Sequence, residues 1–356
     1  MVGKPGVVVG LSGGVDSSVA AALLLQQGYH VIGAMIDVWK DQESQYAASI
    51  SESAAQDAKR VADCLGIPFI VVNAESDFQR EVVQPFVSGY LKGITPSPCS
   101  LCNRRLKGKV LLRIVEEQGA QYAATGHYAR LLRSSETEEY ELLKGVDPNK
   151  DQSYMLALVD HKDLRRFLFP VGAMLKSDIR KMASEMGLPV ADRKDSQDLC
   201  FLPDGDYRGF LKRYTGDSIT PGKIVNTKGE VLGTHEGLPF YTIGQRKGIR
   251  VAAPQPLYVL QKDIQENRLV VGELDELGRS TLVAQEVNWI SGVAPDKPFR
   301  AEIKVRYRSA PKWGLVIPHK DGLSTVQLDK KLRDITPGQV AVFYDGEKII
   351  GGGVID

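Results

Sequence analysis

The sequence is poor in cysteine, in net charge and in long apolar runs, and each shortage argues against a class of protein. Four cysteines in 356 residues do not suggest a secreted scaffold held by disulfides. No window approaches the apolar length of a membrane span. A predicted strand begins so close to residue 1 that no room remains for a signal peptide. We therefore expect a cytoplasmic protein with no membrane segment, and we expect a monomer.

The formal net charge of +1 at pH 7 does not indicate nucleic-acid binding, so the local distribution of charge is more informative. Acidic residues gather at Glu136, Glu138, Glu139 and Glu141, which is typical of a solvated hairpin. Basic residues gather at Arg104, Arg105, Lys107 and Lys109, at Arg246, Lys247 and Arg250, and at Lys304, Arg306, Arg308 and Lys312. Each cluster alone is more typical of a solvated face than of a binding patch.

The stretch that organises the chain is a glycine loop without a lysine. Residues 7–11 are a β-branched run that predicts a buried strand, and residues 15–27 have apolar side chains at helical spacing. The Ser-Gly-Gly between them lets a ligand approach the backbone, and free amides at a helix N-terminus bind anions. A Walker loop needs a lysine after its glycines, and a dinucleotide loop needs Gly-x-Gly-x-x-Gly; both patterns are missing here.

Residues 12–17 read Ser-Gly-Gly-Val-Asp-Ser, which resembles the signature of the PP-loop ATP-pyrophosphatases. Those enzymes cleave ATP between its α and β phosphates and adenylate a carbonyl oxygen. The resemblance implies ATP binding by Gly10, Leu11, Ser12, Gly13, Gly14, Val15, Asp16 and Ser17, with Ser18 beside them. Asp16 supplies the hard oxygen that magnesium prefers, so we expect ATP and Mg²⁺ as cofactors. An ordinary glycine turn is the alternative.

The spacing of predicted elements divides the chain into three domains. Strands alternate with helices up to residue 206, which predicts an α/β domain with a doubly wound parallel sheet. Short β-like runs over 207–277 predict a small, mostly β adaptor. Over 278–356, short strands of alternating apolar and polar residues predict a closed β-barrel. One of these strands, over 299–307, would have a basic face that could position phosphates.

A proline-rich stretch over residues 94–103, expected to be a loop, carries a second candidate site. Cys99 and Cys102 precede several cations, and cations or a helix N-terminus lower a thiol pKa, so a reactive thiolate is expected. A structural zinc site would usually need four ligands. Only Cys200 has a comparable polar setting, with a core thiol as the alternative there. Cys64 lies among apolar residues of a predicted helix and is expected in the core.

Further motifs follow in a fixed order. They are Thr-Pro-Ser-Pro at 95–98 leading to Cys-Asn-Arg at 102–104, Thr-Gly-His-Tyr at 125–128, Lys-Asp-Gln-Ser-Tyr at 150–154, Ser-Gln-Asp-Leu-Cys-Phe at 196–201, Gly-Gln-Arg-Lys-Gly at 244–248 and Ile-Thr-Pro-Gly-Gln at 335–339. Together with the glycine loop they resemble the tRNA-specific 2-thiouridylases, which sulfurate the wobble uridine. The resemblance covers nearly the whole chain, and the order is more specific than any one motif.

This resemblance implies a role for individual residues. Cys200 would carry a persulfide donated by a sulfur-relay protein, and Cys102 would free the sulfur or resolve it as a disulfide. Ser97, Pro98 and Cys99 would line the pocket for the flipped-out base. The adenosine would meet the backbones of Ile36 and Gly126. The anticodon arm of tRNA would be contacted by His127, Lys150, Asp151, Gln152, Arg306, Tyr307 and Gln339.

One position departs from the family pattern, because Cys99 stands where an aspartate is expected to act as an acid or base. The change removes a carboxylate and adds a third thiol to Cys102 and Cys200. Three cysteines with one open iron position resemble the tRNA thiolases that use a [4Fe–4S] cluster. The sequence leaves the persulfide and the cluster open as alternatives, with sulfide as the donor in the second.

The expected reaction is ATP-dependent 2-thiolation of the wobble uridine, with adenylation of the uracil oxygen followed by sulfur transfer. The base must leave its stack to enter such a pocket, so the two β domains would grip the tRNA. Two rival functions remain. A PP-loop ligase or amidotransferase would have no use for Cys102 and Cys200, and a non-catalytic tRNA-binding or sulfur-carrier protein would not need the intact loop at 12–17.

Overall fold

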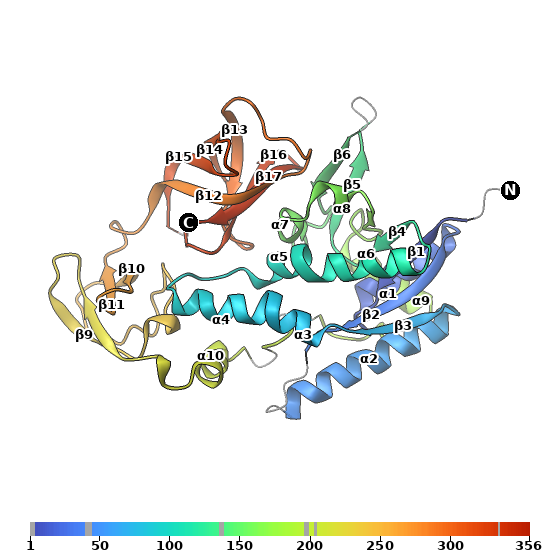
Figure 1. The fold of residues 1–356 in the computed structure, drawn as a ribbon, viewed down its shortest axis with the longest axis horizontal. Coiled ribbons are helices and arrows are strands. Elements are labelled where there is room, and N and C mark those ends of the chain that lie inside the picture. The colour runs from blue at the N-terminus through green and yellow to red at the C-terminus, as the bar shows by residue number, and fades with distance from the viewer. Residues whose placement is uncertain (1–3, 40–44, 135–138, 196–198, 203–204, 334) are drawn as a thin grey trace.

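The computed structural model describes residues 4–39, 45–134, 139–195, 199–202, 205–333 and 335–356. Its strands form three sheets that follow one another along the chain, apart from one hairpin described below (Figure 1). Glu136 and Glu138 of the acidic cluster lie outside the described residues, as do residues 196–198 of the motif that precedes Cys200. In the described part of the chain, no helix is long and apolar enough to cross a membrane.

The first sheet is parallel and is covered by helices on both faces, as predicted. Its strand order is β3-β2-β1-β4-β7, and every pairing is parallel. The strands are β1 (Gly6–Gly10), β2 (His30–Asp37), β3 (Phe69–Asn73), β4 (Tyr122–Ala124) and β7 (Phe167–Leu168). The chain passes from β1 outward to β2 and β3, then returns to the other side of β1 with β4. The strand order therefore reverses beside β1, where open α/β sheets bind their ligands.

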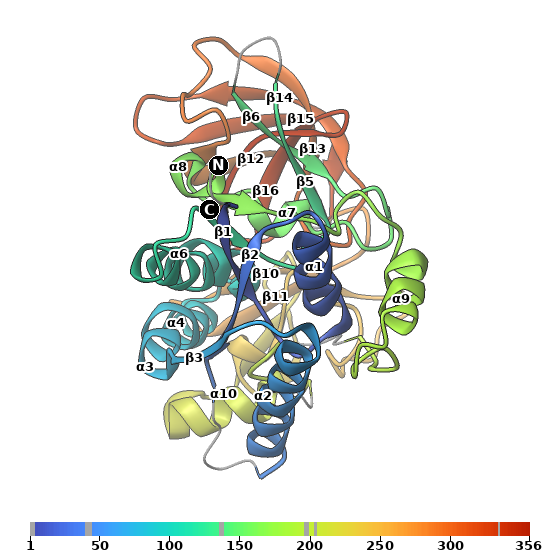
Figure 2. The same ribbon diagram turned by 90° about the vertical axis from the view of Figure 1, so that its right-hand side faces the viewer.

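The alternation of side chains along β1 explains the two helical layers. Val7 and Val9 pack with α1 (Val15–Gln26) and α2 (Gln45–Leu65), whereas Val8 packs with α4 (Gln84–Leu91) and α6 (Gly108–Glu117). Figure 2 shows α1 on one side of β1 and α4 and α6 on the other. A strand buried on both faces is apolar at every position, which is why residues 7–9 are a run of valines.

The proline-rich stretch is only partly a loop. Residues 98–102 form α5 (Pro98–Cys102), which runs through a π-helical turn (Asn103–Lys107) into α6. Pro98 is the first residue of the helix. No hydrogen bond is lost there, because the first N–H groups of a helix have no intrahelical partner, and the fixed φ of proline suits the first turn. The expected loop over residues 94–103 is therefore wrong from residue 98 onward. Cys99 and Cys102 lie three residues apart on one helix and so on neighbouring positions of its surface.

Cys64 corrects a second expectation, because its side chain is exposed rather than in the core. The buried stripe of α2 consists of Ala58, Val61 and Ala62. Cys64 lies about 100° around the helix from the centre of that stripe, given 3.6 residues per turn. Its Sγ instead faces the carbonyl of Gly187 at 3.9 Å.

Short elements connect the first sheet to the rest of the molecule. They are α3 (Glu75–Phe78) and a second π-helical turn (Gln79–Val83), the hairpin β5 (Ala129–Arg133) and β6 (Tyr140–Lys144), and the helices α7 (Ser153–Leu156), α8 (His161–Leu164), α9 (Lys176–Glu185) and α10 (Tyr207–Thr215). The hairpin extends the C-terminal sheet, since Leu143 pairs with Lys348.

The adaptor sheet has the order β10-β11-β8-β9 and consists of β8 (Gly222–Val225), β9 (Val231–His235), β10 (Tyr258–Asp263) and β11 (Arg268–Gly272). Two 3-10 turns, Gly216–Ser218 and Leu238–Phe240, lie in its connections. Its core is continuous with that of the parallel sheet. Phe201, Phe210 and Phe240 are each nearly fully buried in the same apolar cluster as Val8 and Val259.

The C-terminal strands close into the predicted barrel. They are β12 (Arg279–Trp289), β13 (Phe299–Lys304), β14 (Lys312–Pro318), β15 (Ser324–Leu332), β16 (Val340–Asp345) and β17 (Lys348–Ile355). Strand β12 pairs with both β15 and β17, which closes these six strands into a ring. Ile303 and Val305 lie in the barrel core, as the alternation predicted, but β13 ends at Lys304 and not at residue 307 as expected.

Candidate active site

The glycine loop leads from β1 into α1, and its serines hold it in shape. The backbone N–H of Ser12 donates to Ser17 Oγ at 3.2 Å, and the hydroxyls of Ser17 and Ser18 donate to the carbonyl of Gly14 at 3.1 and 2.8 Å. Gly13 has φ of +72°, and a Cβ there would lie 2.5 Å from the carbonyl oxygen of Ala54. Only glycine fits both constraints.

The loop lies between the carboxyl ends of β1 and β4, where the strand order reverses. Gly126 follows β4, and a Cβ on it would lie 2.6 Å from the backbone nitrogen of Ser17. Ile36 is half-buried near the carboxyl end of β2. The residues expected around ATP therefore come from three adjacent strands and meet at one edge of the sheet.

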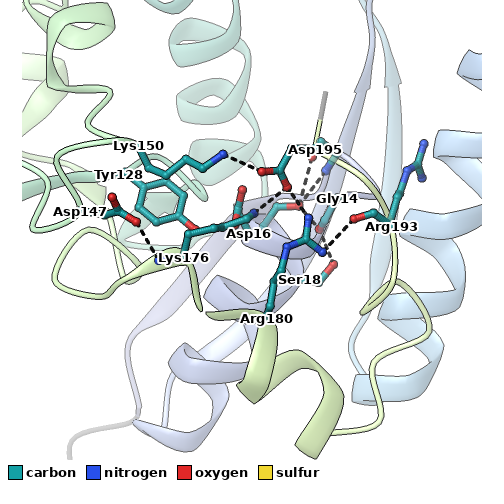
Figure 3. Close-up of polar contacts among 12 residues, drawn as sticks. Gly14, Asp16, Ser18, Tyr128, Asp147, Lys150, Lys176, Arg180, Arg193 and Asp195 are labelled. Atoms are coloured by element: carbon teal, nitrogen blue, oxygen red, sulfur yellow. Dashed lines mark hydrogen bonds and ion pairs between the residues drawn. The ribbon is translucent and has the colours of Figure 1, made fainter. Parts of the chain in front are cut away.

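A network of charges surrounds Asp16, as Figure 3 shows. Asp16 Oδ1 accepts hydrogen bonds from the hydroxyl of Tyr128 at 2.7 Å and from Lys176 Nζ at 2.6 Å. Lys176 Nζ also lies 3.0 Å from Asp195 Oδ1. Asp195 is further paired with Lys150 at 2.7 Å and with Arg180 at 2.6 Å.

The cations around Asp195 decide its ionisation. Burial alone would raise the pKa of this carboxyl, but the hydrogen bonds and charges of Lys150 and Lys176 outweigh burial and lower the pKa to about 2. Asp195 is therefore an anion at neutral pH. The same contact raises the pKa of Lys150.

The sequence analysis missed Lys176, Arg180, Arg193 and Asp195. Arg193 supports the loop from the far side, since it donates to the carbonyl of Gly13 at 3.0 Å and pairs with Asp57. All four lie more than 150 residues beyond the loop, in stretches without a recognisable motif. Only the packing of α9 against α1 brings them there, through contacts of Ile179 and Ala183 with Val15 and Val19.

The donors fit a magnesium ion that arrives with a nucleotide. Such an ion usually takes one or two carboxylates, with phosphates and waters completing its shell. Asp16 offers one carboxylate at the helix N-terminus, beside the amides that suit phosphate.

The three candidate thiols come from two elements and differ in exposure. Cys102 is buried in α5, whereas Cys99 and Cys200 reach solvent. Cys200 is followed by Phe201, whose ring packs against Phe86 and anchors this end of the segment. Lys107 lies near all three sulfurs, and its positive charge acts on the thiols of Cys99 and Cys102. The structure therefore gathers the cysteines that the sequence analysis selected.

The expected lowering of the thiol pKa is wrong for Cys102. Burial raises the pKa of this thiol to about 11, and the positive charge of Lys107 offsets only part of that effect. Although Cys99 is partly exposed to solvent, the protein packed around its sulfur raises the pKa of this thiol as well. The sequence showed the cations but not the cost of removing the thiols from water.

The described residues contain no group of three His, Cys, Asp or Glu side chains placed to hold a metal ion. A [4Fe–4S] cluster, which needs converging thiolates, therefore stays a prediction for Cys99, Cys102 and Cys200. The raised pKa of Cys102 disfavours the thiolate form that such a cluster needs.

These pKa values predict the reactivity of Cys102 toward iodoacetamide. Because the neutral thiol is unreactive, alkylation of Cys102 should be slow at pH 7 and rise about tenfold per pH unit until about pH 11. Mass spectrometry of the tryptic peptides after timed labelling measures this rate, and the exposed Cys64 is an internal control. A rate for Cys102 that levels off near pH 8 would contradict the buried, neutral thiol.

Two of the three residues expected to line the base pocket are buried, at the start of α5, in a segment that the barrel holds. Ser97 and Pro98 are buried, and the hydroxyl of Ser97 hydrogen-bonds that of Ser100 at 3.1 Å. Gln339 of the barrel donates to the carbonyls of Thr95 and Pro96 at 2.8 and 3.2 Å. Gln339, expected to contact tRNA, therefore fixes the segment that leads into the pocket.

The Thr125–Tyr128 segment contacts the loop and lies near Lys107. Nδ1 of His127 hydrogen-bonds Thr125 Oγ1 at 2.7 Å, and burial, with a smaller effect of Lys107, lowers the pKa of His127 to about 4. The imidazole is thus neutral at pH 7. Gly126 packs against the backbone of Asp16 and Ser17, and the charge of Lys107 acts both on His127 and on the thiols of Cys99 and Cys102.

Other residues expected to contact tRNA also make contacts within the protein. Asp151 Oδ1 accepts the backbone N–H groups of Gly145 and Ser153 at 3.0 and 3.1 Å, and Gln152 accepts that of Tyr128 at 3.1 Å. Arg306 donates to the carbonyl of Ile243, at 3.0 Å, and to Thr336, which ties the barrel to the adaptor. The ring of Tyr307 lies 6.2 Å from that of Tyr154.

A serine- and glycine-rich loop at the switch point of a parallel sheet, followed by a β adaptor and a closed barrel, defines a three-part protein with a PP-loop nucleotide domain. Comparison with known proteins agrees. Residues 5–204 match the family model of the tRNA methyl transferase HUP domain, residues 208–273 the tRNA methyl transferase PRC-barrel domain and residues 279–355 the aminomethyltransferase β-barrel domain.

Relatives that align with nearly the full length of the chain identify its family within this class. The tRNA-specific 2-thiouridylase MnmA of Heliobacterium modesticaldum is 47% identical over 99% of this chain and 92% of its own. That of Chloroflexus aggregans is 42% identical over 98% of both chains, and the MnmA 2 of a Thermoanaerobacter species is 44% identical over 98% of this chain and 97% of its own. This chain belongs to the tRNA-specific 2-thiouridylase family.

Proposed function

We propose that this protein catalyses ATP-dependent 2-thiolation of the wobble uridine of tRNA. The observation that carries the proposal is the meeting of two chemistries at the Thr125–Tyr128 segment. Gly126 packs against the phosphate loop, and the charge of Lys107 acts both on His127 and on the thiols of Cys99 and Cys102. An enzyme that activates a carbonyl oxygen with ATP and then replaces it with sulfur needs both groups within reach of one base.

The first step is adenylation. The 2-oxygen of the uracil attacks the α-phosphorus of ATP, and the bond to the bridging oxygen breaks with its electron pair on pyrophosphate. Magnesium held by Asp16 would neutralise phosphate charge. This activation is needed because a uracil carbonyl oxygen is a poor leaving group, whereas AMP leaves readily.

The second step is sulfur transfer from a persulfide on Cys200, which is exposed and accessible to a donor protein. The terminal sulfur attacks C2 and expels AMP. Cys102, after losing its proton, then attacks Cys200 Sγ, which leaves the sulfur on the base and a disulfide between the two cysteines. A thiol reductant restores them. Residues 1–206 would catalyse these steps, while residues 207–277 and 278–356 would grip the anticodon arm.

Incubation of the protein with ATP, Mg²⁺, a tRNA transcript and a persulfide donor tests this function. We expect 2-thiouridine at the wobble position, by mass spectrometry of nucleosides, with one AMP and one pyrophosphate for each. Pyrophosphate release that consumes ammonia and leaves no sulfur on the tRNA would indicate an amide-forming ligase. Tight tRNA binding without pyrophosphate release would indicate a non-catalytic RNA-binding or sulfur-carrier protein.

A further inference from the structure

The phosphate loop contains no cation of its own. Residues 10–18 include neither lysine nor arginine, yet the loop must hold a highly charged polyphosphate. Walker-type loops meet this need with a lysine that follows their glycines. In this structure a lysine from a different helix points at the same place.

That lysine is Lys176, the first residue of α9. It is 8% exposed, and its Nζ lies 2.6 Å from Oδ1 of Asp16, in the first turn of α1. Figure 3 shows its side chain running past the ring of Tyr128 to Asp16 and Asp195. The ammonium group lies 5.9 Å from the centre of that ring.

Lys176 is held at both ends, so its direction is set by the fold. Its backbone N–H donates to Asp147 Oδ2 at 3.0 Å, which fixes the start of α9. Its ammonium group is shared between Asp16 and Asp195, and Asp195 is itself kept in place by Lys150 and Arg180. A buried ammonium group is costly unless it is paired, and here two carboxylates supply the pairing.

In this arrangement Lys176 can exchange one of its two carboxylate partners. Asp16 is the carboxylate suited to magnesium. When Asp16 coordinates the ion, Lys176 loses one of its two carboxylates and is left facing the phosphates that arrive with that ion. Asp195 keeps the lysine oriented throughout, because Lys150 and Arg180 hold its carboxylate in place (Figure 3).

We propose that Lys176 is a catalytic residue of the nucleotide site, which contacts the β and γ phosphates of ATP and stabilises the departing pyrophosphate, with Asp195 as its positioning residue. The proposal rests on the function proposed above. Lys176 transfers no proton in this step: the electron pair of the broken bond goes to pyrophosphate, and the ammonium group neutralises the charge that develops there. A fixed charge of this kind typically contributes about 10²–10³-fold to the rate.

The test compares Lys176→Met with Lys181→Met. Lys181 lies on the same helix with a side chain 75% exposed, so its loss controls for the removal of a lysine from α9. Two affinities are measured in the presence of Mg²⁺, for α,β-methylene-ATP and for AMP, together with kcat for tRNA-dependent pyrophosphate release. Thermal melting reports on folding.

We expect Lys176→Met to weaken the affinity for the ATP analogue by about tenfold or more, because a charged hydrogen bond is lost. The affinity for AMP should stay within about twofold of the wild-type value. The kcat should fall by about 10²-fold. Lys181→Met should match the wild type in both affinities and in kcat. If Lys176→Met does not fold, Lys176→Arg replaces it: the charge remains but its centre moves, so kcat falls while AMP affinity holds.

Equal losses of affinity for AMP and for the ATP analogue, or an unchanged kcat, would assign Lys176 a structural role and overturn the proposal. A wild-type protein that binds the analogue through Lys176 but releases no pyrophosphate with tRNA would refute the proposed function and leave the phosphate contact standing. The two failures are therefore distinguishable.

Discussion

Replacement of Cys200 by serine should abolish 2-thiouridine formation while pyrophosphate release with tRNA continues. A serine hydroxyl cannot carry a persulfide, so the second step stops. The adenylation step uses the loop at residues 12–17, which the substitution does not touch. The expected loss of thiolation is on the order of 10³-fold or more, the scale on which enzymes respond to removal of a nucleophile.

The experiment measures 2-thiouridine by mass spectrometry and pyrophosphate by a coupled assay in the same reaction. Cys64→Ser is the matched control, because Cys64 is also an exposed thiol but lies on α2, away from the other three cysteines. Cys99→Ser adds a separate comparison, in which full activity would show that the persulfide route needs only Cys102 and Cys200. Thiolation that survives in Cys200→Ser would exclude this residue as the sulfur carrier.

Replacement of Gly126 by alanine should remove most adenylation activity without unfolding the protein. The new Cβ would lie 2.6 Å from the nitrogen of Ser17 and 2.7 Å from the carbonyl carbon of Asp16. Both are backbone atoms at the start of α1 and cannot rotate away. The loop must therefore shift, and misplacement of reacting groups by about 1 Å costs about 10²-fold in rate.

Pyrophosphate release and affinity for an ATP analogue measure this effect, and thermal melting measures the stability. Gly233→Ala is the control, since a Cβ there would meet its nearest neighbour, a methyl group of Val251, at an ordinary 3.4 Å. A wild-type affinity for the ATP analogue and a wild-type rate of pyrophosphate release in Gly126→Ala would mean that ATP does not bind at the carboxyl ends of β1 and β4.

Local patterns predicted the order of the domains well. The valines at 7–9 predicted a buried strand, and the helical spacing after the glycine loop predicted α1. The alternation of Ile303 and Val305 with polar residues predicted a strand of the closed barrel. In each of these stretches the signal lies within a few consecutive residues, where hydrophobic periodicity and turn chemistry act directly.

Predictions failed where the outcome depended on neighbours distant in the sequence. Cys64 has apolar neighbours along the chain but lies beside the buried stripe of its helix. Cys102 has cations nearby, yet its burial decides the pKa. The tRNA contacts expected of Gln339 and Arg306 stay predictions, and within the protein these residues join the barrel to the N-terminal domain and to the adaptor.

By itself the sequence determined the three-part fold, and it singled out the glycine loop at 12–17 and the candidate cysteines, because each of these is a local pattern of residue types. The tertiary structure alone decided that Lys176 supplies the cation the loop lacks and that Asp195 holds it. It also decided which thiols are buried. Charge pairing and desolvation depend on distances between residues far apart in the chain, and only the packing of α9 on α1 and of α5 beneath the barrel sets those distances.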